Sequence, residues 1–168
     1  RQPVINSIIA RFPNTLLLAF LAMIVESLLG VSLGILSAVR QYTVLDRVMV
    51  VVALVFASIP GFWLGLMLIT VFAVNLKLLP VFGADSLRHF ILPTLTVSLT
   101  SAAGLLRLTR ASMLETIRQD YIKTARSKGQ TERKVILKHA LKNALIPVIT
   151  VIGFQLGMIM GGSVVIES

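Results

Sequence analysis

The residues of this chain that could do chemistry are few, and most of the charged ones gather in a single stretch. Between Arg107 and Lys142 lie ten of the sixteen Lys and Arg residues, against only three Asp and Glu residues. A basic segment between apolar segments is typical of a cytoplasmic loop in a membrane protein, because cytoplasmic loops carry an excess of Lys and Arg. The net charge of +9 alone would suit a nucleic-acid-binding protein. Its placement argues against that class, and we expect no nucleic-acid partner.

The pattern within the basic stretch predicts two short helices joined at a glycine. Ser112 and Glu115 have the spacing of a capping box, so a helix should open there and run on through Tyr121. That helix should end at Lys128-Gly129, because glycine readily adopts the left-handed conformation that closes a helix.

A second helix should begin at Thr131-Glu132, where a polar residue and an acid suit a helix N-terminus. Its apolar stripe would consist of Val135, Ile136, His139 and Ala140. Two short helices hinged at a glycine suit docking to a protein partner. A basic amphipathic loop lying on anionic lipid headgroups is the other interpretation, and the pattern alone favours neither.

Glu26 is an acid inside a predicted membrane span. An ionisable group at membrane depth is costly, so Glu26 is a candidate for a translocation path or for pairing with a cation. A neutral, hydrogen-bonded packing role is the alternative, and both stay open. The sequence has no cysteine and no G-x-x-x-x-G-K-[ST] loop for ATP. His89 and His139 fall on opposite sides of the expected topology, so we predict no metal site and no catalytic residue.

The elements that position these residues are apolar helices. The chain is 56% hydrophobic and 14% charged, with a mean hydropathy of +0.90, which favours a membrane as its solvent. Four segments approach the length of a membrane span: 15–39, 48–74 (interrupted by Pro60 and Gly61), 90–106 and 145–166. The third is the shortest and most polar. We therefore predict an all-α integral membrane protein with one transmembrane domain over residues 1–168. Arg1 is not a methionine, and the sequence stops at Ser168, shortly after an apolar run, so we expect a piece of a longer protein.

The loops predict the orientation of these spans. The basic loop, residues 107–146, should be cytoplasmic, as should the turn 40–47, while 75–89 should face outward. Glycines at i, i+4 spacing predict faces where helices pack closely, with a sliding or pore-lining face as the alternative. These glycines are Gly30 and Gly34, Gly61 and Gly65, and Gly153, Gly157 and Gly161.

Two runs of the basic loop carry a resemblance to a known family. The sequence DYIKTARSKG at 120–129, followed by HALKNALIP at 139–147, resembles the EAA loop of binding-protein-dependent ABC importer permeases. More narrowly, it is similar to the B-type permeases of dipeptide, oligopeptide and nickel importers, including glutathione permeases. Other segments that resemble landmarks of this family precede the loop, in the same order as in the family. They are Leu45-Asp46-Arg47, the run IPGFWLG at 59–65, and Leu79-Pro80 with Ile91-Leu92-Pro93. The resemblance covers essentially the whole chain.

This resemblance implies a type I ABC importer transmembrane domain in a bacterial or archaeal inner membrane, multi-pass and surrounded by membrane lipid. Its implied partners are a second homologous permease subunit, two cytoplasmic ABC ATPase subunits and an extracytoplasmic substrate-binding protein. ATP would be bound by the ATPase, so this chain would need no cofactor and would not itself be an enzyme. The cargo would be di- or oligopeptides, glutathione or nickel.

The resemblance also assigns an ATPase-coupling role to individual residues. Ala125 and Gly129 match the second alanine and the glycine of the motif, and Thr124 stands at the first alanine. Lys123 replaces a glutamate and Lys142 replaces a proline, which weakens any assignment of a specific acidic contact with the ATPase. The residues carried over are Asp120, Tyr121, Lys123, Thr124, Ala125, Lys128, Gly129, His139, Ala140, Leu141, Asn143 and Pro147.

Two other functions compete with a permease. An ion-coupled secondary carrier would need ionisable residues near the membrane midplane and often shows inverted repeats. Glu26 is the only candidate of that kind, and the sequence shows no internal repeat. A membrane scaffold that recruits a cytoplasmic partner through the basic loop is the second alternative.

Overall fold

The computed structural model describes residues 4–167, with side chains described for 12–155, and this part of the chain is helical without a strand. The helices are α1 (Val4–Val39), α2 (Val44–Ser58), α3 (Gly61–Leu68), η1 (Ile69–Asn75), α4 (Leu87–Ile117), α5 (Asp120–Ser127), α6 (Glu132–Lys134), η2 (Val135–Ala140) and α7 (Leu141–Glu167); η1 and η2 are π-helical. The predicted all-α class is confirmed.

Three stretches are long and apolar enough to cross a membrane: Phe12–Val39, Leu87–Ile117 and Glu132–Gln155. A fourth crossing exists only if α2 and the α3–η1 helix together form one span, and these two are bent by 98°. The predicted span over 48–74, interrupted at Pro60 and Gly61, corresponds to this broken pair of helices, and whether the pair crosses the membrane as one span stays a prediction. Ile59 and Pro60 have extended backbones at the break, with ψ of 125° and 131°. A proline disfavours the helical conformation in the residue before it, which explains why α2 ends there.

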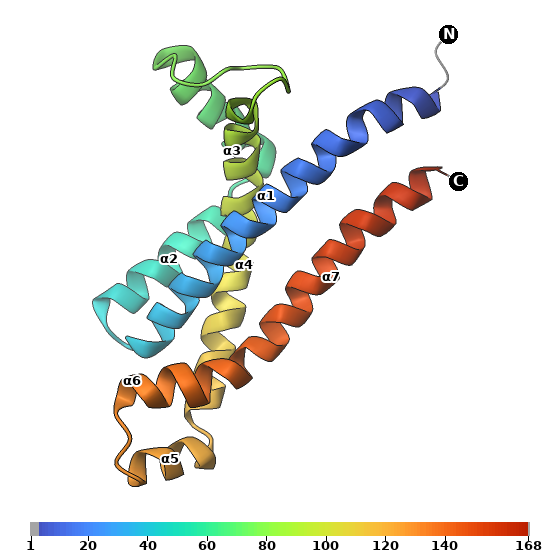
Figure 1. Ribbon diagram of the computed structural model, residues 1–168. Helices are drawn as coiled ribbons and strands as arrows, with labels where there is room; N and C mark the ends of the chain where they lie inside the picture. The colour runs from blue at the N-terminus through green and yellow to red at the C-terminus, as the bar shows by residue number, and fades with distance from the viewer. Residues whose placement is uncertain (1–3, 168) are drawn as a thin grey trace.

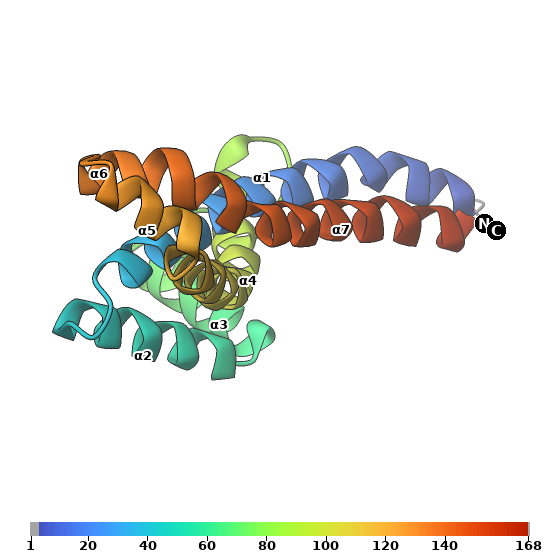
Figure 2. The same cartoon turned by 90° about the horizontal axis from the view of Figure 1, so that it is seen from below.

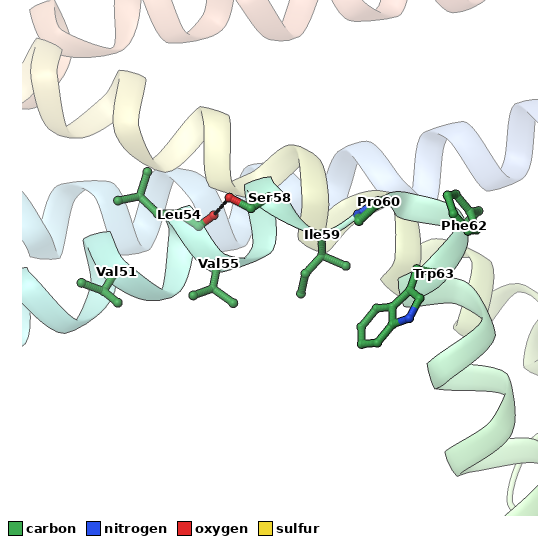
Figure 3. A pocket seen from close by; sticks show the side chains of 8 residues that line it. All are labelled: Val51, Leu54, Val55, Ser58, Ile59, Pro60, Phe62 and Trp63. Atoms are coloured by element: carbon green, nitrogen blue, oxygen red, sulfur yellow. Dashed lines mark hydrogen bonds between the residues drawn. The ribbon is translucent and has the colours of Figure 1, made fainter.

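The bend leaves an apolar hollow of about 580 Å³ between α2 and α3 (Figure 3). Val51 and Val55 line it from α2, and Trp63 lines it from α3. The one hydroxyl drawn there, that of Ser58, donates to the Leu54 carbonyl at 2.8 Å. The hollow thus offers a largely apolar surface, to which the Trp63 indole nitrogen adds one polar group.

Helix α4 is the central element of the structure and contacts α1, α2, α3 and α7. The predicted third span, 90–106, was too short, because α4 continues to Ile117. Its polar residues do not interrupt the helix, since Thr96 donates to the Leu92 carbonyl at 2.8 Å and Thr100 to the Thr96 carbonyl at 3.2 Å. Hydroxyls satisfied in this way remain compatible with a helix in the membrane.

Gly30 and Gly34 set the close approach of α1 to α4. A Cβ atom at Gly30 would lie 2.7 Å from the Leu105 Cβ, and one at Gly34 would lie 2.6 Å from the Thr109 Cβ. Both separations are too short for real atoms, so only glycine allows this contact. The predicted helix-packing role is confirmed for this pair.

The other glycine pairs differ from the prediction. A Cβ at Gly65 would be in ordinary contact, 3.4 Å from Thr96, while Gly61 and Gly153 have nothing within 4 Å. Gly157 and Gly161 lie outside the described side chains. The i, i+4 spacing therefore marks a close helix contact only at Gly30 and Gly34 among the described glycines.

The loops alternate between two ends of the molecule as the orientation rule predicted. Figure 1 shows α5, α6 and the turn between α1 and α2 together at one end, with the connection 76–86 at the opposite end. Seen from below in Figure 2, α7 runs alongside α1, and the two helices are in contact. The basic loop and the turn 40–47 therefore share one face of the protein.

Candidate functional site

Helix α5 lies at the centre of the basic loop and is shorter than predicted. It begins at Asp120 rather than near Ser112, because Ser112 and Glu115 belong to the last turns of α4. The predicted capping box is therefore wrong. The Ser112 hydroxyl instead donates to the Ala144 carbonyl of α7 at 2.8 Å, which ties α4 to α7.

The predicted stop at Lys128-Gly129 is confirmed. Gly129 has a φ of +72°, and its backbone N–H donates to the Arg126 carbonyl at 2.9 Å. This left-handed conformation favours glycine over residues that carry a Cβ. The chain then turns back and restarts at Glu132, also as predicted.

The second helix of the loop does not end before the next span. Residues 132–167 are helical throughout, as α6, η2 and α7 follow one another without a gap. Figure 1 shows a change of direction where η2 meets α7. Pro147 lies inside α7, as expected for a proline near the start of a membrane helix. The second half of the loop, from Glu132, is therefore an extension of the membrane helix itself.

A buried cluster joins the loop to the membrane helices. Val135, Ile136 and Ala140 are at most 7% exposed, which confirms the predicted apolar stripe; His139 is half-buried beside it. Eight buried side chains from α1, α4, α5, η2 and α7 form this coupling core: Ala38, Met113, Ile122, Ala125, Val135, Ile136, Ala140 and Ala144. A load on α5 would reach α1 and α4 through these contacts, because close-packed interiors transmit strain.

Ala125, to which the resemblance assigns an ATPase-coupling role, packs inside this chain. It is 6% exposed and lies inside the coupling core, so its small side chain serves packing within this chain. A partner would instead meet the opposite face of α5 and its neighbours. The predicted site residues that are exposed are Asp120, Tyr121, Lys123, Thr124, Lys128 and Gly129 on α5 and the turn after it, and Asn143 and Pro147 on α7, where Leu141 is half-buried.

Polar contacts hold α5 against the following helix. Arg126 donates to both carboxylate oxygens of Glu132 at 3.0 and 2.6 Å, across the turn at Gly129. The Asn143 amide donates to the Tyr121 hydroxyl at 2.7 Å. The His139 Nε2 lies 2.8 Å from the Gln130 side-chain oxygen. The exposed face is thus fixed in position before any partner binds.

The electrostatics of the exposed face depend on one local ion pair. The Lys123 ammonium lies 2.9 Å from the Asp120 carboxylate and lowers its pKa. Near the C-terminal end of the helix, the Glu132 carboxylate raises the pKa of the Arg126 guanidinium. Both pairs are solvent-exposed, so salt screens them and each contributes little to stability by itself.

Sequence reasoning missed a buried ion pair at the same end of the molecule. Arg110 of α4 donates from Nε to Asp46 Oδ1 at 2.8 Å and from Nη2 to Oδ2 at 2.9 Å. The same carboxylate accepts the Ser37 hydroxyl of α1 and the Tyr42 backbone N–H at 3.0 Å. This polar anchor (Ser37, Asp46 and Arg110) joins α1, α2 and α4. Arg110 had counted only as a cation of the loop, and its partner 64 positions away leaves no local signal.

Glu26 lies away from the coupling core, in the middle part of α1. Its side chain is 5% exposed and hydrogen-bonds with Ser101 of α4. The predicted pairing with a cation is not found among the ion pairs of the described residues. The hydrogen-bonded packing alternative gains support, while a role in the path remains a prediction.

The chain is similar to known transport proteins over almost its whole length. Residues 30–168 match the family model described as "Binding-protein-dependent transport system inner membrane component". The glutathione transport system permease protein GsiC of Escherichia coli strain K12 is 45% identical over 167 residues, which are 99% of this chain and 55% of that protein. The same protein of Shigella boydii serotype 4 is 44% identical over the same shares. The chain thus spans about half the length of the curated relatives it matches.

Proposed function

The chain belongs to the family of binding-protein-dependent transport system inner membrane components, and from this premise we propose that it is the membrane-spanning permease subunit of an ATP-driven importer. Its cargo would be di- or oligopeptides, or glutathione or nickel, moved into the cytoplasm. The family match does not favour an ion-coupled carrier or a passive scaffold. Glutathione is the cargo named for the GsiC relatives and is therefore one candidate here.

The observation that supports this proposal best is the construction of the loop. Helix α5 buries Ile122 completely and Ala125 almost completely, while Thr124 and Lys128 stay exposed on its outer side. A lipid-binding amphipathic helix would need an apolar face free to enter the membrane. Here the apolar face is already occupied by the coupling core, so the outer face available to a partner is polar and suits a soluble protein surface.

The proposed partner at this face is a cytoplasmic ATPase, which would bind ATP on behalf of the complex. The full importer would contain two ATPase subunits, a second homologous permease and an extracytoplasmic substrate-binding protein. Movement of the ATPase pair would push on α5. The coupling core would then carry that movement to α1, α4 and α7 as a rigid displacement of packed helices.

The test is a bulky substitution on the outer face of α5. Thr124→Trp in the complete importer should cut co-purification of the ATPase and cargo-stimulated ATP hydrolysis by at least tenfold, because the indole would fill the contact. Val52→Trp adds the same bulk to an exposed position of α2 and should change both by less than twofold. Both variants should insert at normal levels. Normal coupling in Thr124→Trp would refute the docking role of this face.

A further inference from the structure

A pocket in the membrane-spanning part of the protein contains an acid that has no ion-pair partner among the described residues, together with other polar side chains. It has a volume of about 520 Å³ and lies between α1, α4 and α7. Figure 1 shows that these three helices run past one another between the two loop-bearing ends of the molecule. Most of the lining is apolar, including Ala22, Val97 and Phe154. Its polar lining includes Glu26, Ser101 and Gln155.

The pocket contains two acceptor groups, the Glu26 carboxylate and the Gln155 side-chain oxygen, together with the hydroxyls of Thr15 and Ser101. Glu26 is 5% exposed, and the Ser101 hydroxyl donates to its carboxylate. The Gln155 side-chain oxygen is buried and has no hydrogen-bond partner in the described part of the chain. Native proteins rarely leave such an atom unpaired, so a donor from outside these residues is expected. The missing donor and the missing counter-charge fall in the same pocket.

We infer that this pocket binds a primary ammonium group of the transported cargo, with Glu26 as the counter-ion and Gln155 as a second acceptor. The inference rests on the proposed function and identifies the class of cargo. An ammonium carries three donors and no acceptor, which matches a pocket lined by a carboxylate and by an amide oxygen that has no partner among the described residues. The pocket volume also falls in the range that accommodates small ligands.

The same site suits an amine better than a metal ion. Hard and borderline metal ions need several carboxylate or imidazole ligands. No group of three His, Cys, Asp or Glu side chains that could hold a metal occurs among the described residues. An amino terminus of a peptide, or the free amine of glutathione, has the required chemistry. Within the proposed cargoes, the pocket therefore favours these over nickel.

The experiment compares two cargoes that differ only in the amine. The complete importer with its binding protein is reconstituted in vesicles, and uptake of dialanine and of N-acetyl-dialanine is measured. Glu26→Gln keeps the shape of the side chain and removes its charge. It should lower dialanine uptake by about tenfold, the effect of losing one charge-assisted hydrogen bond, and leave N-acetyl-dialanine uptake within twofold. Asp85→Asn, which neutralises an exposed acid in the 76–86 connection, should alter neither.

For each cargo, uptake by the variant is divided by uptake by the wild type. Any preference of the binding protein for one cargo over the other cancels in this ratio. An equal loss for both cargoes, or no loss for either, would overturn the inference and leave Glu26 as a packing residue or the partner of a cation on another subunit. Absence of ATP-dependent uptake of either cargo by the wild-type importer would count against the proposed function instead.

A chemical readout decides the case in which only the amine-bearing cargo is imported. Dicyclohexylcarbodiimide activates a buried carboxyl group; an adjacent amine then attacks the acyl carbon, an amide forms, and dicyclohexylurea leaves with the oxygen. The vanadate-trapped importer should gain the mass of dialanine minus one water at Glu26. A transport-active complex that gives no such adduct would overturn the inference.

Discussion

The polar anchor of Ser37, Asp46 and Arg110 makes a quantitative prediction about stability. The Asp46 side chain is 4% exposed and receives both hydrogen bonds of a bidentate Arg110 guanidinium. Arg110→Met would leave the carboxylate buried without its counter-charge. Breaking a buried pair in this way destabilises a protein by about 3–5 kcal/mol. Arg110→Lys keeps the charge but loses the fork geometry, so about 1–2 kcal/mol should be lost.

Removing the acid should be less harmful than removing the base. Arg110 is 26% exposed, so in Asp46→Asn its guanidinium can turn to water, and we expect a loss of about 2 kcal/mol. The double variant Asp46→Asn with Arg110→Met should then be more stable than the sum of the single effects, because neither charge remains unpaired. The double variant should lose at least about 1 kcal/mol less stability than the two single variants lose together.

The assay is denaturant-induced loss of helical circular dichroism in detergent micelles, measured for each variant. Arg118→Met is the matched control, because Arg118 is exposed at the end of the same helix. An exposed substitution of this kind should stay within about 0.5 kcal/mol of wild type. If Arg110→Met is no less stable than Arg118→Met, the polar anchor does not hold the three helices together and this reasoning fails.

Four further perturbations separate the roles of individual residues. Gly129→Leu should abolish cargo uptake while membrane insertion stays normal. Gly129→Asn should retain most of the uptake, because asparagine tolerates a φ of +72°. Normal uptake in Gly129→Leu would contradict a conformational role for this glycine. Gly34→Ala should destabilise the helix packing by about 1–3 kcal/mol, because the new Cβ would lie 2.8 Å from the Leu106 carbonyl oxygen. Gly104→Ala has open space around the new Cβ and should be neutral or stabilising in thermal unfolding. Equal melting temperatures for these two variants would refute the prediction. Reversing Asp120 or Lys123 singly should weaken ATPase co-purification more at low salt than at high salt, and salt-independent loss would exclude screened contacts. Because the pKa of Asp120 is lowered, its contact with Lys123 should persist at neutral pH and disappear only as pH falls through that lowered value, as tested by helix content against pH.

The parts of the fold that sequence could predict are those fixed by local chemistry. The stop at Gly129 follows from backbone freedom at one residue, and the apolar stripe of Val135, Ile136 and Ala140 follows from helical spacing. Both were predicted correctly. The apolar segments were also located, since each carries enough hydropathy by itself.

The errors arose where a distant contact overrides a local pattern. Ser112 and Glu115 match a capping box, yet α4 continues through them because Met113 is fully buried in the coupling core and Ser112 bonds to Ala144 of α7. The same limit hid the partner of Asp46, since nothing near Arg110 in sequence distinguishes it from the other basic residues. The bend of 98° was out of reach for a related reason. A proline predicts that a helix stops, whereas the direction of the next helix depends on its packing against α4.

The distribution of tight contacts indicates which parts of the protein can move as one body. The coupling core and the polar anchor both lie at the end of the molecule that carries the basic loop. There they join α5 and the start of α2 to the ends of α1 and α4. Gly30 and Gly34 extend this close contact further along α1 and α4. The connection at Ile59 and Pro60 has an extended backbone, and its side chains border a hollow on one side. Displacement of α5 should therefore carry α1, α4 and the first half of α2 together, with rotation concentrated at the Ile59–Pro60 break, because rigid-body changes are absorbed at the few residues whose packing permits it.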